Sequence, residues 1–114
     1  MGEVMLTFDI GTQSLRGMLM NAHGEIEAFV QKKYELPYFS QNPGWAEQKP
    51  NFYFETLCEV SKELKAKSAS GFDQVIGVTV TAIRDTCLCL DENMEPLRDI
   101  IVWPDSRETN SETQ

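Results

Sequence analysis

The sequence predicts an α/β domain built on a mixed sheet, and two observations carry that prediction. Three short strand-like segments joined by tight turns open the chain. A single amphipathic helix then leads to a new run of β-branched residues and two further short strands. The order β-β-β-α-β-β-β, an antiparallel meander followed by a helical crossover, favours a mixed sheet with a helix packed on it.

The opening meander covers the first third of the chain. Residues 4–8 form a continuous apolar run, which is typical of a buried central strand. Residues 16–21 form the second strand, and residues 22–25 have the composition of a hairpin turn. Residues 25–36 alternate in part between apolar and polar side chains, so we expect a third strand at an edge of the sheet.

A long loop and the helix come next. Residues 37–50 hold three prolines and a glycine, which predicts a loop anchored by Trp45. Residues 51–68 form the helix, for which Asn51 is the expected N-cap and whose end is expected at Ser70-Gly71. Apolar positions at helical spacing give it a core-packing face, formed by Phe54, Leu57, Cys58, Val60 and Leu64.

The last third of the chain returns to strands. Residues 75–80 are β-branched and predict another buried strand. Residues 86–90 and 100–103 predict two short strands, separated by a turn at 91–96. The chain then closes on residues 107–114 without an apolar side chain, so we expect there the start of a helix or linker, and a fragment of a longer protein.

Composition limits the class of protein. The 114 residues carry a net charge of −8, which argues against nucleic acid or an acidic membrane as partner. No segment resembles a signal peptide or a membrane span. Three cysteines, two of them on one side of the 86–90 strand, predict buried reduced thiols rather than a disulfide framework. We therefore expect a cytoplasmic protein.

The turn between the first two strands carries chemistry suited to a phosphate. Asp9 ends the first strand and can hold Mg²⁺, which prefers hard oxygen ligands. Gly11 and Thr12 can present backbone N–H groups, and Arg16 can neutralise charge on a transferring group. No Gly-Lys-Ser/Thr follows, so this is not a Walker loop. An ordinary hairpin turn explains the same residues, and the pattern alone leaves both readings open.

Two further clusters follow predicted strands. Arg84 and Asp85 come after the 75–80 strand, where open α/β sheets place their ligands, and could bind neighbouring hydroxyls. Trp103 ends the last strand and could form one wall of a polyol pocket. A surface ion pair at the first cluster and core packing at the second explain these residues equally well.

Taken together, the clusters resemble the N-terminal part of the FGGY carbohydrate kinases, which include glycerol, xylulose, gluconate and autoinducer-2 kinases. Three blocks in order carry the resemblance and span nearly the whole chain: Asp9-Ile-Gly-Thr-Gln-Ser-Leu-Arg16, Pro43-Gly-Trp-Ala-Glu-Gln-Lys-Pro50, and the stretch from Leu90 to Arg107. The third is similar to the family's Leu-Asp-x-x-Gly-x-Pro-Leu-x-x-x-Ile-x-Trp-x-Asp-x-Arg.

This resemblance implies a ribonuclease H-like fold of the actin-like ATPase and hexokinase superfamily, here as an incomplete domain. It implies that residues 1–114 begin the substrate-binding domain and that a second, nucleotide-binding domain lies outside this chain. It implies ATP-dependent phosphorylation of a sugar or polyol, with ATP and Mg²⁺ as cofactors and a homo-oligomer as the full-length form. The catalytic Asp is expected downstream, so the isolated fragment should be inactive.

The resemblance also implies roles for individual residues. Arg84, Asp85 and Trp103 would bind the substrate, and Asp9 would hold the metal. The ATP phosphates and Mg²⁺ would be served by Asp9, Gly11, Thr12, Gln13, Ser14 and Arg16.

Departures from the family pattern leave the substrate open. Xylulose kinases carry Met-His where this chain has Ile83-Arg84, and Asp85 is one methylene shorter than the Glu of glycerol kinase. Met94 replaces a common turn glycine. A sugar-binding or regulatory module of the same fold is the alternative function. A different actin-like ATPase is a third reading, but it gives no reason for the Trp45 and Trp103 blocks.

Overall fold

The computed structural model describes residues 2–107, which divide into two units. The first, here called the sheet unit, contains the described residues up to 35 together with residues 51–83. The second, here called the loop unit, contains residues 36–50 and the described residues from 84 onward. The expected helix or linker at the C-terminus lies outside the described residues, apart from Arg107.

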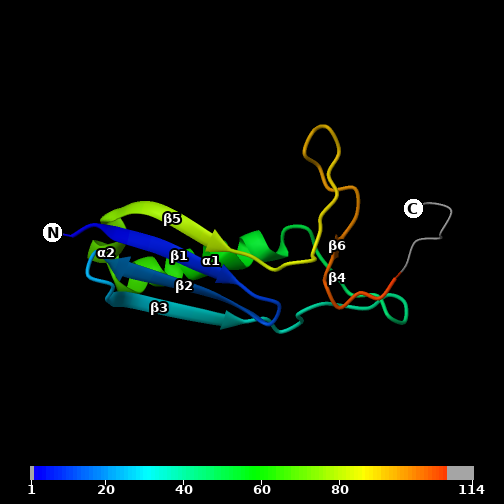
Figure 1. Ribbon diagram of the computed structural model, residues 1–114, viewed down its shortest axis with the longest axis horizontal. Coiled ribbons are helices and arrows are strands. Elements are labelled where there is room, and N and C mark those ends of the chain that lie inside the picture. Colours follow the sequence, from blue (N-terminus) through cyan, green and yellow to red (C-terminus); the bar gives the residue numbers. More distant parts are fainter. Residues whose placement is uncertain (1, 108–114) are drawn as a thin grey trace. The chain divides into compact units, whose positions relative to one another are not determined.

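The sheet unit is built on four strands in the order β3-β2-β1-β5 (Figure 1). β1 (Val4–Ile10) pairs antiparallel with β2 (Ser14–Asn21), which pairs antiparallel with β3 (Ile26–Lys33). β5 (Val75–Thr81) lies parallel to β1 on its other side. The predicted mixed sheet and the edge position of the third strand are therefore confirmed.

One helix covers part of this sheet. α1 (Phe52–Lys67) packs on β2 and β3, where the apolar core gathers alternate residues of the strands. Gly17 of β2 permits the contact, because a Cβ built there would lie 2.6 Å from Val60 Cγ1 and 3.0 Å from Leu64 Cδ1. Both of these side chains are fully buried. A larger residue at position 17 would therefore displace the helix and disrupt the packing of the core.

The ends of α1 differ from the prediction in two ways. Asn51 precedes the helix, but its side chain makes no capping hydrogen bond, because its backbone has φ −93° and ψ 0° rather than the extended conformation of a capping residue. Its carbonyl instead accepts the backbone N–H of Glu55 at 2.9 Å. Ser70-Gly71 does not end the helical segment, because a second short helix, α2 (Ala69–Asp73), contains both residues.

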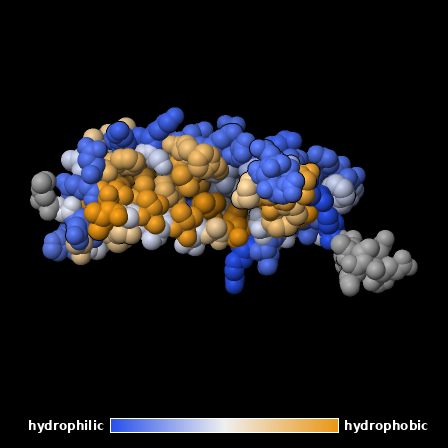
Figure 2. All heavy atoms as spheres, turned by 90° about the horizontal axis from the view of Figure 1, so that it is seen from above, coloured by the Kyte–Doolittle hydropathy of each residue, from blue (hydrophilic) through white to orange (hydrophobic). Residues whose placement is uncertain are grey.

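The expected burial of the 75–80 strand is wrong. β5 lies at an edge of the described sheet, and α1 packs on β2 and β3 instead. Ile76, Val78 and Val80 are consequently 65%, 56% and 53% exposed. Figure 2 shows apolar side chains gathered on the face of the molecule that includes β5. A β-branched run predicts a strand, but its burial depends on neighbours outside that run.

The loop unit has little regular structure. β4 (Glu47–Gln48), inside the expected loop, pairs antiparallel with β6 (Ile100–Ile101). The predicted strand at 86–90 is wrong, because only isolated bridges form there, from Cys87 to Ile101 and from Leu90 to Pro96.

The cysteines of the loop unit also depart from expectation. Cys87 and Cys89 are free thiols as predicted, but both are exposed rather than buried. With no regular strand at 86–90, the alternation of apolar residues there does not create a buried side. Within residues 2–107, no helix is both long enough and apolar enough to cross a membrane.

A turn in the loop unit gives a test of backbone strain. Met94 has a φ of 64°, a left-handed conformation that costs a residue with a Cβ about 1–2 kcal/mol. We expect Met94→Gly to raise the free energy of unfolding by about 0.5–1 kcal/mol, the gain being reduced by the greater freedom of glycine in the unfolded chain. Denaturant titration followed by circular dichroism measures it.

The matched control makes the reverse exchange in a turn of the sheet unit. Gly24 has a φ of 79° and nothing within 4 Å of a built Cβ, so Gly24→Ala adds strain without a collision. It should lower the free energy of unfolding by about 1 kcal/mol. Equal stability of Met94→Gly and the wild type would contradict the strain at this turn.

Candidate functional site

The turn between β1 and β2 places an acid and a base opposite each other. Asp9 and Arg16 are paired residues of the two strands, and Arg16 Nη1 donates to Asp9 Oδ2 at 2.9 Å. Their side chains are 45% and 40% exposed, so the pair lies at the surface and can exchange partners with a ligand. Because a surface ion pair contributes only about 0–1 kcal/mol, a phosphate or a cation can compete for either member.

The turn itself is held by its backbone. Gly11 N–H donates to the Ser14 carbonyl at 2.9 Å, and a Cβ on Gly11 would lie 3.0 Å from that same oxygen. Thr12 is partly exposed and Gln13 is exposed, which leaves the tip of the turn open to solvent. Ser14 is buried, and its hydroxyl accepts a bond from Gln31 Nε2 of β3 at 3.2 Å. In this structure the Ser14 hydroxyl therefore ties the turn to the neighbouring strand.

A residue that the sequence did not single out supports this turn. Tyr34, directly after β3, donates its hydroxyl to the Gly11 carbonyl at 3.0 Å and its backbone N–H to the Gln13 carbonyl at 3.0 Å. Its ring is buried. The only sequence feature that could have pointed to Tyr34 is an aromatic residue near the end of the expected 25–36 strand. That feature does not indicate which turn the residue contacts.

The donor set at the turn fits Mg²⁺ only together with a nucleotide. Among the described residues there is no cluster of three or more His, Cys, Asp or Glu side chains that could hold a metal by themselves. Mg²⁺ is commonly bound by one or two carboxylates, several waters and the phosphates of its ligand. The partly exposed carboxylate of Asp9 meets the protein's share of that requirement.

The two other predicted clusters lie in the loop unit, and the Thr86 side chain forms hydrogen bonds to both of them. Arg84 and Asp85 are exposed, and Asp85 has a φ of 53°, uncommon for a residue other than glycine. Thr86 Oγ1 donates to the Arg84 carbonyl at 3.3 Å and accepts the Trp103 N–H at 3.2 Å. The structure thus brings Arg84, Asp85 and Trp103 together, while the turn residues lie in the sheet unit.

Trp103 is 56% exposed, which rules out core packing within the described residues. Its backbone, not its indole, carries the link through Thr86 to the Arg84 carbonyl. Trp45, the expected anchor of the 37–50 loop, is covered by a cation. The Arg107 guanidinium lies over its ring, 3.8 Å from the ring centre. A cation over an aromatic face is favourable, and it fixes Trp45 as a structural residue of this unit.

A buried carboxylate organises the loop unit around Trp45. Asp105 accepts the Ala46 N–H at 2.7 Å, the Arg107 N–H at 2.9 Å and Arg107 Nε at 2.8 Å. Glu47, also buried, lies 3.4 Å from the guanidinium groups of both Arg98 and Arg107. The Arg107 guanidinium, then the N–H groups of Ala46 and Arg107, hold the pKa of Asp105 well below its usual range. From the sequence, these residues are noted only as members of the blocks that resemble the FGGY family, and no contact between them is predicted.

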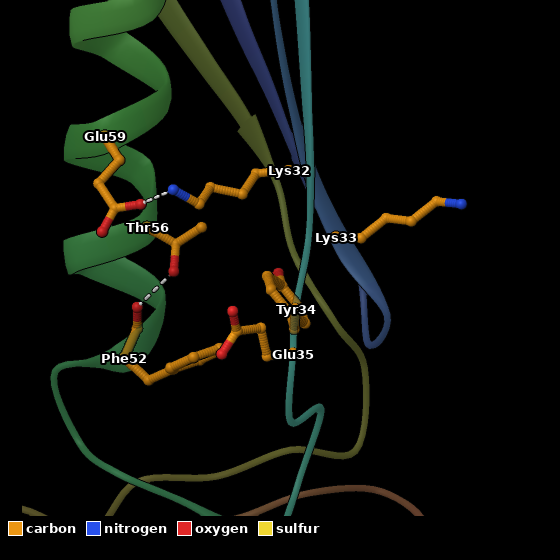
Figure 3. A pocket seen from close by; sticks show the side chains of 7 residues that line it. All are labelled: Lys32, Lys33, Tyr34, Glu35, Phe52, Thr56 and Glu59. Atoms are coloured by element: carbon orange, nitrogen blue, oxygen red, sulfur yellow. Dashed lines mark hydrogen bonds and ion pairs between the residues drawn. The ribbon is translucent and has the colours of Figure 1, made fainter.

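The sheet unit also contains a pocket of about 340 Å³ between the end of β3 and the first turns of α1. Figure 3 shows Lys32 reaching Glu59 of the helix in an ion pair, while Lys33 points away from the helix. Thr56 donates its hydroxyl to the Phe52 carbonyl at 2.9 Å, so it already has a partner. This pocket was not expected from the sequence and contains none of the predicted site residues.

The fold is that of solved sugar kinases, which have the actin-like ATPase fold. A xylulose kinase from Rhodospirillum rubrum superposes with a TM-score of 0.80 at 27% identity, covering 90% of this chain and 20% of that one. A structure described as a xyloylose kinase from Brucella ovis gives a TM-score of 0.86 over 92% of this chain and 22% of that one, and its 22% identity supports the fold alone.

The sequence comparisons then give the family. Residues 4–114 match the FGGY family of carbohydrate kinases, N-terminal domain, and the chain belongs to this family. A glycerol kinase from Gloeobacter violaceus is 34% identical over 104 residues, covering 90% of this chain and 20% of that protein. A glycerol kinase from Burkholderia cenocepacia is 31% identical over 106 residues, covering 92% and 21%. The chain therefore spans about a fifth of the length of these curated relatives.

The Asp105 cluster makes stability depend on pH. Because the folded-state pKa of Asp105 lies below its ordinary value of about 4, its contribution is present above about pH 4 and is lost as the pH falls further. Asp105→Asn should lower the free energy of unfolding at neutral pH by about 2 kcal/mol, because bonds to a charged acceptor are lost. It should also weaken the dependence on pH below about pH 5.

Urea midpoints measured across the acidic range check this expectation. Asp99→Asn is the control, because Asp99 pairs at 3.3 Å with an exposed lysine, Lys49, and a surface pair contributes little. If Asp105→Asn and Asp99→Asn lose the same stability and keep the same acid sensitivity, the cluster around Asp105 does not stabilise the unit as argued.

Proposed function

We propose that the protein containing this chain transfers the γ-phosphate of ATP to a hydroxyl group of a sugar or polyol. The observation that carries the proposal is the turn at Asp9 and Arg16, where a partly exposed carboxylate, a partly exposed guanidinium and a hydrogen-bonded backbone turn lie together. Membership of the FGGY family supports it. The glycerol kinase relatives are about five times longer, so we assign the activity to a longer protein, of which this chain would supply one part.

At the phosphate end, these residues have complementary tasks. Phosphoryl transfer depends on positioning and on charge stabilisation more than on covalent help from the protein. Arg16 would neutralise charge on the transferred group once a phosphate draws it from Asp9, and Asp9 would hold Mg²⁺. The metal, when bound, screens the charge of the phosphate oxygens. The N–H groups of the turn would fix the orientation of the phosphates.

At the substrate end, Arg84 and Asp85 would orient the acceptor. A guanidinium donates and a carboxylate accepts, so the two together can bind neighbouring hydroxyl groups of a polyol. The exposed face of Trp103 would pack against the carbon side of the same molecule. We propose that the base that removes the hydroxyl proton, and the site for adenosine, lie outside residues 1–114.

The setting of the reaction belongs to the same proposal. The three free cysteines support a reducing compartment such as the cytoplasm. A homo-oligomeric full-length protein stays a prediction that rests on the family resemblance.

The direct test is a coupled assay of the full-length protein with ATP, Mg²⁺ and a panel of sugars and polyols. We expect phosphorylation of at least one member. Asp9→Asn should lower kcat about 100-fold or more, because a charge that acts on the transferring group is lost. Arg84→Ala should raise the KM for the acceptor about tenfold or more, because a charged donor to a hydroxyl is lost.

Arg98→Ala serves as the control for Arg84→Ala. Arg98 is also an exposed arginine of the loop unit, but it contacts Glu47 and not the Arg84-Asp85 turn. It should leave the KM for the acceptor within about twofold of the wild type. If the folded protein phosphorylates no member of the panel, the kinase assignment is wrong. Sugar binding without phosphoryl transfer would indicate a sugar-binding module instead.

A further inference from the structure

Tyr34 binds the 11–13 turn at both of its ends. The side-chain hydroxyl donates to the Gly11 carbonyl, and the backbone N–H donates to the Gln13 carbonyl, each at 3.0 Å. One residue therefore contacts the first and the last residue of the three that join β1 to β2. With both carbonyls engaged by Tyr34, the Gly11–Thr12 and Gln13–Ser14 peptide planes are held, and so are the directions of the Thr12 and Ser14 N–H groups on those planes.

The ring of Tyr34 is itself held in place by the start of α1. Phe52 lies edge-to-face with it at 4.9 Å between ring centres, and Tyr53 does so at 5.9 Å. The rings of Phe52 and Tyr53 also contact each other edge-to-face at 5.3 Å. Figure 3 shows Tyr34 at the end of β3, beside the first turn of the helix. A three-ring cluster with these contacts restricts the Tyr34 phenol to a direction that reaches Gly11.

We propose that Tyr34 is a positioning residue for phosphoryl transfer, which holds the 11–13 turn so that its backbone N–H groups are preorganised for a phosphate. This inference rests on the proposed function. Donors accelerate a reaction only when they are already oriented toward the developing charge, within about 0.5 Å of the productive position. A turn that starts with glycine has more backbone freedom than other turns, and Tyr34 removes that freedom.

The protonation state of the phenol agrees with this role. Burial raises the pKa of Tyr34 above its usual value, and the nearby Tyr53 and Asp9 raise it further, while Arg16 opposes them. The hydroxyl therefore stays a neutral donor to the Gly11 carbonyl at any physiological pH.

Tyr53 supplies a matched control within the same cluster. Its hydroxyl is also buried, but among the described residues it makes no hydrogen bond. Tyr34→Phe and Tyr53→Phe each remove one buried phenolic oxygen and keep the ring, and only Tyr34→Phe releases the turn. Because an unpaired buried hydroxyl is unfavourable, Tyr53→Phe should be neutral or stabilising.

The first measurement is amide hydrogen exchange on the 114-residue chain. Gly11 N–H, bonded to Ser14, and the N–H of residue 34, bonded to Gln13, report on the turn. In Tyr34→Phe both should exchange about fivefold faster, while amides in the middle of β2 keep their rates. Tyr53→Phe should leave both amides unchanged. Unchanged exchange in Tyr34→Phe would overturn the proposal, because Tyr34 would then have no effect on the turn. An equal rise in exchange throughout β2 would also overturn it, because Tyr34 would then act on global stability.

The second measurement is steady-state kinetics of the full-length protein. Tyr34→Phe should lower kcat about fivefold or more, because the donors of the turn act on the transferred group, and it should leave the KM of the acceptor within about twofold. An unchanged kcat with faster exchange at the turn would overturn the positioning role. An inactive wild type would overturn the proposed function, and the exchange rates would still decide whether Tyr34 holds the turn.

Discussion

The sheet unit depends on the close approach of α1 to β2 at Gly17. Only a residue without a Cβ leaves room for Val60 and Leu64, the two fully buried side chains of the helix. That contact fixes the height of α1 over the sheet, and the first turn of the helix brings Phe52 and Tyr53 against Tyr34. Since Tyr34 bonds to the turn after β1, the geometry of the candidate phosphate site depends on packing at Gly17, which lies four residues beyond the end of that turn.

The loop unit is stabilised on a different principle. It has few strand pairs, and its interior holds the charged side chains of Glu47, Asp105 and Arg107 in place of a large apolar core. Removing one partner of such a network leaves a buried charge without compensation, so its members constrain one another tightly. Thr86 links the Arg84-Asp85 turn to Trp103, and Trp103 lies two residues before Asp105. The candidate substrate residues are thereby attached to the most constrained part of this unit.

Local pattern was enough to predict most of the sheet unit. The apolar run of β1, the partial alternation of β3 and the 3.6-residue period of α1 are properties of short segments, and the structure confirms all three elements. The predicted apolar face of α1 is wrong at Phe54, which is 68% exposed. Burial of β5 and of Cys87 could not be predicted in the same way, because it depends on which neighbours cover them. The Tyr34–Gly11 bond joins residues 23 positions apart, and Ala46 and Asp105 are 59 apart. No motif within one segment indicates such pairs. The resemblance to the FGGY family located the blocks but did not reveal what their residues contact.

Among the described residues, Asp85 and Met94 are the non-glycine residues with a left-handed backbone, and this conformation has a different explanation at each. Met94 adopts it in an exposed turn, where Asp91 accepts the backbone N–H groups of Asn93 and Glu95 and where glycine would serve as well. Asp85 adopts it between Arg84 and Thr86, whose hydroxyl contacts the Arg84 carbonyl on one side and Trp103 on the other. Glycine there would relieve the strain but remove the carboxylate. Backbone strain of this kind is found mostly at functional sites, where the surrounding structure maintains it. The left-handed conformation of Asp85 therefore agrees with its proposed role in orienting the acceptor.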